Sequence, residues 1–216
     1  MIQFDNVTAT YKKNIGIFNI SFKVSAGDMV FIMGPTGAGK STILKTIYKD
    51  MLIDSGKILI DDNDITTINS SVHTSNVRKN IGMIFQDFKL LENRTVFENV
   101  ALPLHIEGYS RKQIIQSVDE ALNKVSLRGS EKFYPLQLSG GEQQRVCIAR
   151  ALVKKPKIIL ADEPTGNLDP NISDDILDLL DVCTKDGSTV LMSTHNFPLI
   201  KPRKRKFIEL SKGRMI

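Results

Sequence analysis

Cysteine is scarce in this sequence of 216 residues, which contains only Cys147 and Cys183. Each lies within an apolar helical pattern, so we expect two buried thiols. Buried thiols are typical of proteins that work in a reducing compartment such as the cytoplasm.

Long apolar runs are also missing. No uncharged apolar stretch reaches the roughly 18 residues that a transmembrane helix needs. The first residues, Met1–Asp5, contain neither a basic segment nor an apolar run, so we expect no signal peptide. If the protein serves a membrane process, a partner must therefore supply the membrane part. The chain is long enough for one sizeable domain, or a core domain with a small subdomain.

Acidic residues are outnumbered: 24 Asp and Glu stand against 29 Lys and Arg, which gives a net charge of +5. Much of the excess lies in the run 201–206, Lys-Pro-Arg-Lys-Arg-Lys. The plainest interpretation of this run is a solvated basic loop. Contact with anionic lipid headgroups is a second interpretation and DNA binding a third. The charge alone indicates an affinity for polyanions without saying which kind.

A glycine-rich motif, Gly34–Ser41, matches the pattern G-x-x-x-x-G-K-[ST] of a phosphate-binding P-loop. Its glycines let backbone N–H groups turn toward a triphosphate. We expect Lys40 to reach the β- and γ-phosphates and the Ser41 hydroxyl to ligate Mg²⁺. The expected nucleotide-binding residues of this loop are Gly34, Pro35, Thr36, Gly37, Ala38, Gly39, Lys40, Ser41 and Thr42.

The pattern of the remaining chain predicts an α/β fold. Short apolar and β-type runs predict strands at 2–4, 20–24, 29–33, 55–60, 81–85, 158–162 and 189–193. Helical spacing predicts helices at 41–47, in two segments between 95 and 137 with Ser110 as an N-cap, at 145–153 and at 172–183. We therefore expect a P-loop NTPase core with a β-rich N-terminal subdomain and a helical insert at about 92–150, all within one domain, 1–216.

A second motif stands about a hundred residues after the P-loop. It is Leu138-Ser139-Gly140-Gly141-Glu142-Gln143-Gln144-Arg145. With the P-loop, it resembles the ATP-binding subunits of ABC transporters. The resemblance implies that Ser139 and Gly141 contact the γ-phosphate of ATP held by the P-loop of another subunit. Two identical chains would then form a homodimer on ATP binding, with two composite sites.

The same resemblance implies the roles of polar residues that follow the predicted strands. Asp162 matches the Walker-B aspartate that holds Mg²⁺ through water, and Glu163 matches the general base. Gln86 matches the Q-loop glutamine, a contact of Mg²⁺ and water. His195 matches the H-loop histidine that hydrogen-bonds the γ-phosphate. Tyr11 matches the aromatic residue that stacks on adenine.

The stretch 85–104 narrows the resemblance. Phe-Gln-Asp-Phe, followed by Leu-Leu and Arg-Thr-Val, is similar to the family of bacterial cell-division ATP-binding proteins, the FtsE family. That similarity implies an FtsX-like transmembrane partner, a peripheral location on the cytoplasmic face of the cell membrane, and indirect control of cell-wall hydrolases. It implies no specific nucleic-acid partner. Phe88, Leu90 and Leu91 could form a groove for a partner helix, or equally belong to the core.

Two other functions share the same ATP chemistry. One is the ATPase subunit of a transporter that releases lipoproteins or exports macrolides or lipids. The other is a soluble ABC ATPase that acts on nucleic acid or ribosomes. Proteins of the second kind usually have tandem domains or a long coiled coil, and this sequence has neither. The segment 196–202 departs from the acidic, helical sequence usual after the H-loop histidine.

Overall fold

The computed structural model describes residues 1–12, 15–68 and 70–216. The strands are β1 (Ile2–Lys12), β2 (Ile15–Val24), β3 (Met29–Met33), β4 (Ser55–Ile60), β5 (Asn63–Asp64), β6 (Ile81–Ile84), β7 (Ile158–Asp162), β8 (Thr189–Thr194), β9 (Lys206–Ser211) and β10 (Arg214–Met215). The helices are α1 (Lys40–Ile47), α2 (Ser71–Lys79), α3 (Val96–Ile106), α4 (Arg111–Lys124), α5 (Gly140–Leu152), α6 (Pro170–Lys185) and α7 (Phe197–Ile200), with 3₁₀ turns at Pro135–Gln137 and Lys201–Arg203.

The larger sheet carries the strand order β10-β9-β3-β8-β7-β6. Neighbouring strands from β9 to β6 are parallel, while β10 pairs antiparallel with β9. Residues on both faces of β3, β6, β7 and β8 are buried, as their continuous apolar runs predict. The carboxyl ends of these four strands share one edge of the sheet. The P-loop, Gln86, Asp162, Glu163 and His195 lie at that edge, whereas Tyr11 lies on β1 and Ser139 and Gly141 lie at the start of α5.

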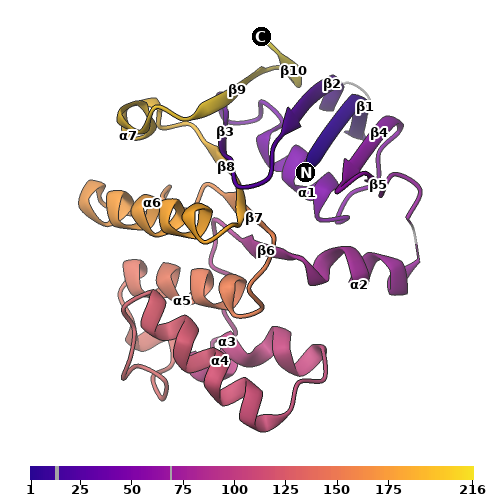
Figure 1. Ribbon diagram of the computed structural model, residues 1–216. Helices are drawn as coiled ribbons and strands as arrows, with labels where there is room; N and C mark the ends of the chain where they lie inside the picture. The colour runs from indigo at the N-terminus through magenta and orange to yellow at the C-terminus, as the bar shows by residue number, and fades with distance from the viewer. Residues whose placement is uncertain (13–14, 69) are drawn as a thin grey trace.

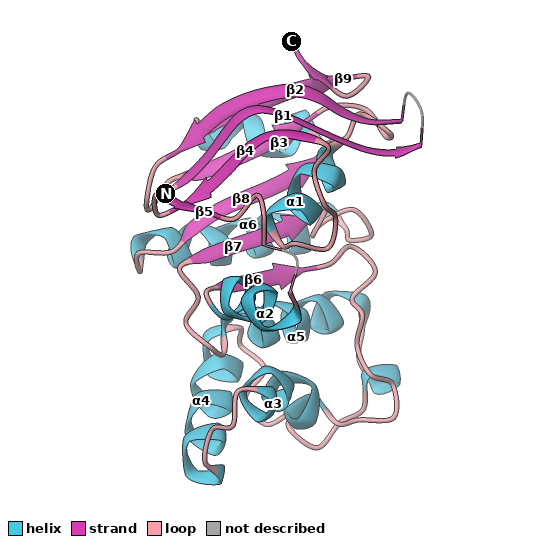
Figure 2. Ribbon diagram, turned by 90° about the vertical axis from the view of Figure 1, so that its right-hand side faces the viewer, coloured by secondary structure: helices cyan, strands magenta, loops and turns pink. Residues whose placement is uncertain are grey.

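A smaller antiparallel sheet, β2-β1-β4-β5, covers α1 and one face of the larger sheet (Figure 2). Val30 and Ile32 of β3 belong to the apolar cluster on this face, together with Ile43 and Leu44 of α1. The intervening Phe31 belongs to the cluster on the opposite face. Alternate side chains of β3 thus pack into the apolar clusters on opposite faces of the sheet. The β-rich N-terminal part predicted from the sequence is confirmed.

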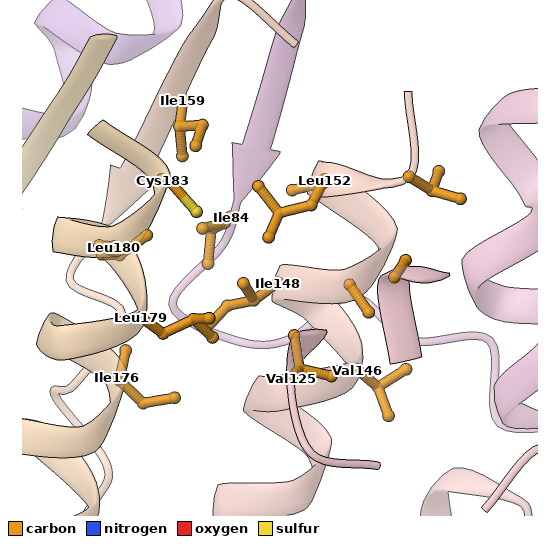
Figure 3. Packing of buried hydrophobic residues seen from close by; sticks show 14 of the residues in the cluster. Ile84, Val125, Val146, Ile148, Leu152, Ile159, Ile176, Leu179, Leu180 and Cys183 are labelled. Atoms are coloured by element: carbon orange, nitrogen blue, oxygen red, sulfur yellow. The ribbon is translucent and has the colours of Figure 1, made fainter. Parts of the chain in front are cut away.

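Helices α5 and α6 cover the opposite face, and α3 and α4 lie beyond α5 (Figure 1). Apolar side chains of α5, α6 and the sheet meet in this core (Figure 3). Cys183 is among them and Cys147 is buried as well, so the prediction of buried thiols is confirmed. Ser110 caps α4 as predicted, because its hydroxyl accepts a hydrogen bond from the Gln113 amide. The helix predicted at 145–153 begins earlier, at Gly140.

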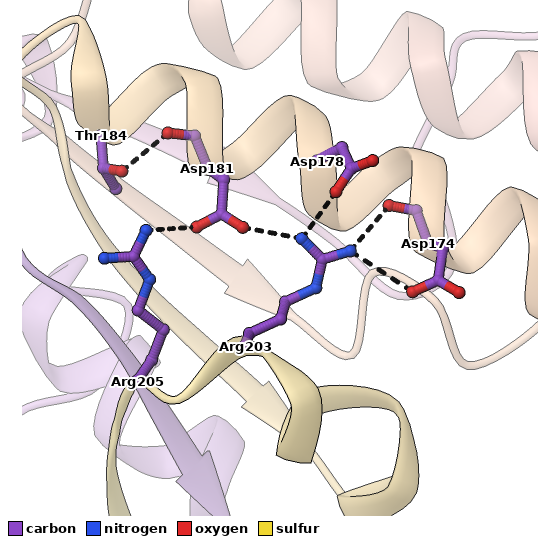
Figure 4. A network of polar contacts seen from close by, with 6 residues as sticks. All are labelled: Asp174, Asp178, Asp181, Thr184, Arg203 and Arg205. Atoms are coloured by element: carbon purple, nitrogen blue, oxygen red, sulfur yellow. Dashed lines mark hydrogen bonds and ion pairs between the residues drawn. The ribbon is translucent and has the colours of Figure 1, made fainter.

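The basic run 201–206 is mostly exposed, as a solvated loop would be, but Arg203 is partly buried. The Arg203 guanidinium is only 13% exposed and forms ion pairs with Asp178 and Asp181 of α6. Arg205 also pairs with Asp181 (Figure 4). The acidic face of α6 therefore pairs with two cations of the run, Arg203 and Arg205, while Lys206 pairs with Asp28. Among the described residues, no helix combines the length and the apolar composition that a membrane span requires.

Candidate functional site

The P-loop forms a tight backbone turn between β3 and α1. Gly39, the N-cap of α1, has φ 104° and a Cβ there would lie 2.7 Å from Ile17 Cγ2. Gly34 has φ 148° and a Cβ there would lie 2.3 Å from the Leu210 carbonyl oxygen. The turn therefore requires glycine at both positions, which brings the loop's backbone and the N-terminus of α1 to face one cavity.

Lys40 lies at the centre of this turn, with its side chain 4% exposed. Its ammonium donates hydrogen bonds to the carbonyl oxygens of Gly34 (2.9 Å) and Pro35 (3.2 Å). It also forms an ion pair with Glu163 Oε1 at 3.1 Å. These contacts hold one positive charge at the base of the cradle, where a triphosphate needs it.

Asp162, the last residue of β7, receives two hydroxyl donors. Ser41 Oγ donates to Asp162 Oδ1 at 2.9 Å, and Ser193 Oγ of β8 donates to the same oxygen at 2.6 Å. Sequence reasoning missed Ser193; its signal is a polar residue near the end of a buried strand, beside the strand that ends in Asp162. Ser193 Oγ also accepts from the Glu163 amide at 2.9 Å, so one buried hydroxyl orients both acids.

Glu163 bridges two cationic or polar partners. Its Oε1 pairs with Lys40, and its Oε2 lies 2.8 Å from His195 Nδ1. The backbone of Glu163 is left-handed, with φ 43°, a conformation that costs a non-glycine residue about 1–3 kcal/mol. Strain of this kind gathers at functional sites, where surrounding contacts hold it in place. Here the Glu163 amide donates to Ser193, and the Gly166 amide donates to the Glu163 carbonyl oxygen.

The structure brings most of the predicted residues to one cavity of about 340 Å³. Its lining comprises Tyr11, Ile15, Gly16, Thr36, Gly37, Gly39, Lys40, Ser41, Thr42, Gln86 and Glu163. Tyr11 lies at this cavity and is 52% exposed, so its ring is accessible to a planar base; the Lys45 ammonium lies 5.7 Å from the ring centre. Ile15 and Gly16 were not predicted; they are brought to the cavity by the pairing of β2 with β1.

Ser139 and Gly141 are not among the residues that line this cavity in the described part of the chain. Ser139 caps α5, and its amide and hydroxyl both donate to Glu142 Oε2 (2.8 and 2.7 Å). These hydrogen bonds hold the pKa of the Glu142 carboxyl below its usual range. Gly141 is buried, and a Cβ there would approach Ile172 of α6 to 3.0 Å. The motif thus forms the capped N-terminus of α5, and Ser139 and Gly141 lie outside the cavity of their own P-loop.

The donor set fits a nucleotide with magnesium. No group of three or more His, Cys, Asp or Glu side chains that could hold a metal occurs in the described residues. Mg²⁺ does not need one at a phosphate site, because it takes one or two protein oxygens, water and phosphate oxygens. Ser41, Asp162 and Gln86 offer hydroxyl, carboxylate and amide oxygens beside the phosphate cradle.

A second hollow, of about 750 Å³, lies between α2, α3 and α5 and is called the α2–α3 groove below. Its apolar lining includes Phe85 after β6 and Leu102, Pro103 and Ile106 of α3. Arg150 of α5, also in the lining, donates to the carbonyl oxygens of Phe88 and Lys89 (2.7 and 2.6 Å).

Leu90 does not line the groove; it packs against the core beneath α3 and α5. The structure therefore favours the core interpretation for Leu90. The apolar wall of the groove comes from α3 instead, where Ile106 is 73% exposed.

Known proteins resemble this chain in sequence and in fold. A family model described as ABC transporter matches residues 17–166. The chain is 46% identical over 216 residues to the cell division ATP-binding protein FtsE of Escherichia coli, covering 100% of this chain and 97% of that protein. It is 41% identical over 218 residues to FtsE of Mycobacterium tuberculosis, covering 100% and 94%. A dimeric post-hydrolysis structure of the ATP-binding cassette MJ0796, bound to ADP and Pi, has a TM-score of 0.88 at 36% identity, covering 100% and 96%.

Proposed function

Because the chain belongs to the ABC transporter family of ATP-binding proteins, we propose that it is a Mg²⁺-dependent ATPase whose turnover drives a membrane partner. The observation that carries this proposal is the meeting of Lys40, Glu163 and His195 at the carboxyl edge of the sheet. The whole chain, 1–216, then acts as one nucleotide-binding domain, with the helical part at about 92–150 as its subdomain.

Hydrolysis requires water to attack the γ-phosphorus while the bond to ADP breaks and a proton passes to a base. Glu163 is the base in this proposal. Lys40 forms an ion pair with Glu163 Oε1 at 3.1 Å. When Lys40 binds the phosphate oxygens instead, this Glu163 oxygen becomes available to accept the proton. His195 exchanges its contact with the other carboxylate oxygen for one with the γ-phosphate, to which it donates. Gly34–Thr42 bind the phosphates through backbone amides, and Tyr11 stacks on adenine.

Ser41, Asp162 and Gln86 would hold Mg²⁺ beside the cradle. When bound, the ion neutralises charge on the β- and γ-phosphate oxygens. Ser193 keeps Asp162 oriented toward Ser41, since both hydroxyls donate to the same carboxylate oxygen.

We propose that ATP binding closes a homodimer in which Ser139 and Gly141 of one chain complete the site of the other. Their separation from their own P-loop cavity supports this arrangement. A structural relative is a dimeric cassette, which also supports it.

The membrane partner is proposed to be an FtsX-like transmembrane protein, with this chain peripheral on the cytoplasmic face of the bacterial cell membrane. Relatives named for cell division match over nearly their full length, which supports a role in division. ATP-driven closure would then control cell-wall hydrolases through the partner.

The ATPase assignment is tested by two variants. Lys40→Ala should abolish tight ATP binding, because it removes the buried cation of the cradle. Glu163→Gln should retain binding, lose turnover and accumulate an ATP-bound dimer in size-exclusion chromatography with MgATP. Lys57→Ala, which removes an exposed lysine of β4, is the control and should behave like the parent protein. A Glu163→Gln monomer with parental turnover would contradict the general-base role.

Docking is tested at the α2–α3 groove. Ile106→Glu places a carboxylate on its apolar wall, and burying an unpaired charge against a partner costs several kcal/mol. The variant should therefore leave the membrane fraction while ATP binding is unchanged. The matched control is Ile115→Glu on α4, which changes an exposed isoleucine that does not line the groove. Membrane-bound Ile106→Glu, or loss of lipoprotein sorting or drug efflux with normal division on gene deletion, would count against the proposed partner.

A further inference from the structure

The segment that follows His195 is a short helical turn held at both ends. Thr194 Oγ1 accepts from the Asn196 amide at 3.0 Å, and Asn196 Oδ1 accepts from the Leu199 amide at 3.2 Å. Helix α7 then runs directly into the 3₁₀ turn Lys201–Arg203. Helical backbone therefore runs from Phe197 to Arg203, and the N-cap residue Asn196 links it to His195.

Arg203 fastens the far end of this turn to α6. Its guanidinium contacts the carboxylates of Asp178 (2.8 Å), Asp181 (2.7 Å) and Asp174 (3.3 Å), and it also donates to the Asp174 carbonyl oxygen (3.2 Å). Figure 4 shows these partners along one face of α6, as their spacing of four and three residues requires. Such forked contacts fix a position better than a single ion pair does.

Helix α6 in turn follows the loop that begins at Glu163. Asp169 caps its first turn by accepting from the amides of Asn171 and Ile172. The side chains of Glu163 and His195 are 2.8 Å apart, and each residue starts a segment. Arg203, at the end of one segment, contacts the α6 part of the other from Asp174 to Asp181. The two segments are thus in contact both at Glu163 and His195 and at Arg203 and α6.

Between these segments lies a cavity of about 310 Å³, whose lining includes Glu163, His195, Asn196 and Leu199. The His195 side chain is half exposed, and its Nδ1 contacts Glu163 Oε2. The Glu163 carboxylate holds the imidazole on this side. Its position depends on the backbone turn, which is anchored by the buried Ile200 and by Arg203.

We propose that Arg203 is a positioning residue for His195: it locks α7 to α6 and so keeps the imidazole within hydrogen-bond reach of Glu163 and the γ-phosphate. Arg203 can have this role only if His195 acts in hydrolysis as proposed above. Within the basic run, Arg203 then serves to hold α7 against α6.

Arg203→Ala should lower the kcat of ATP hydrolysis by roughly 10- to 100-fold, since a shift of about 1 Å at a catalytic group can have effects of that order. The KM for ATP should change little, because the P-loop and Tyr11 are untouched. Arg203→Lys should recover part of the kcat, because a lysine keeps the charge but cannot fork between the carboxylates. Lys206→Ala, which removes a cation of the same run that pairs with Asp28 and not with α6, should keep parental kcat.

The decisive measurement repeats Arg203→Ala in a His195→Ala background. If Arg203 acts through His195, the double variant should be no slower than His195→Ala alone. Independent, multiplied losses, or parental kcat in Arg203→Ala, would overturn the proposal. If thermal unfolding shows that Arg203→Ala does not fold, Arg203→Lys is compared in the two backgrounds by the same criterion. Parental kcat in His195→Ala would instead refute the role given to His195 itself, and with it both proposals.

Discussion

At the scale of single residues, Glu163 combines the side chain proposed as the general base with a strained backbone. Its φ of 43° is reached directly after the buried strand β7, where the chain turns sharply into the loop before α6. The turn directs the carboxylate toward Lys40 and His195 instead of along the strand. The strain is therefore part of how the site is assembled.

Comparing Glu163→Gly with Glu163→Ala isolates this strain. Both variants lose the carboxylate and should lose turnover equally. Glycine tolerates the left-handed backbone, whereas alanine does not, so Glu163→Gly should be more stable by about 1 kcal/mol in urea unfolding. Equal stabilities would show that the loop relaxes to another conformation once the carboxylate is gone.

At the scale of elements, Gly82 decides how closely β6 and α5 pack. A Cβ at Gly82 would lie 2.5 Å from the Ala151 carbonyl oxygen, which is backbone and cannot turn aside. Gly140, at the start of α5, has only Leu168 Cδ2 near its Cβ position, at an ordinary 3.8 Å. The two glycines therefore differ in what a methyl group would meet.

Gly82→Ala should destabilise the protein by about 1–3 kcal/mol, because the strand and helix must separate to admit the methyl group. Gly140→Ala, the same change in an open position, should be neutral or slightly stabilising, since alanine favours a helix. Thermal unfolding of the two variants measures the difference. A Gly82→Ala protein as stable as the parent would mean that α5 slides on β6 at little cost.

The elements that sequence reasoning found are those with a strong local signal. The buried strand β3 is an unbroken apolar run, β8 has an apolar centre, and the capping chemistry of Ser110 indicated the start of α4. Helix α2 was missed because none of its side chains is buried, so it has no apolar stripe to detect. Strand β9 was hidden because it begins with the last lysine of the basic run.

The site divides in the same way. The P-loop and the acids after β7 have fixed spacing in the sequence and could be placed from it. The Ser193 hydroxyl and the fastening of Arg203 to α6 could not, because each depends on strands or helices that are neighbours only in the folded chain. From composition alone, Arg203 is expected to face solvent, whereas in the folded chain it forms ion pairs with three aspartates of α6.

At the scale of the whole molecule, the proposed site is split between two copies. Ser139→Arg and Lys40→Ala chains should each be inactive alone, because one lacks the signature contact and the other the phosphate cation. In a mixed dimer, one site keeps an intact Lys40 opposite an intact Ser139, so part of the hydrolysis should return. Phosphate release by verified heterodimers is the measurement, and Ser139→Arg mixed with itself is the control. No recovery would place Ser139 outside the partner's site.

The sheet order also constrains how the protein can be made. Strand β3, which leads into the P-loop, pairs with β8 and β9, and Gly34 rests against the Leu210 backbone while the Gly213 amide donates to the Ala38 carbonyl. On a ribosome, the P-loop therefore emerges well before the strands that support it. Pairings this distant in sequence form late. A nascent chain accordingly cannot complete the proposed nucleotide site until Gly213 has left the exit tunnel. Chains truncated before Gly213 should therefore have no ATPase activity.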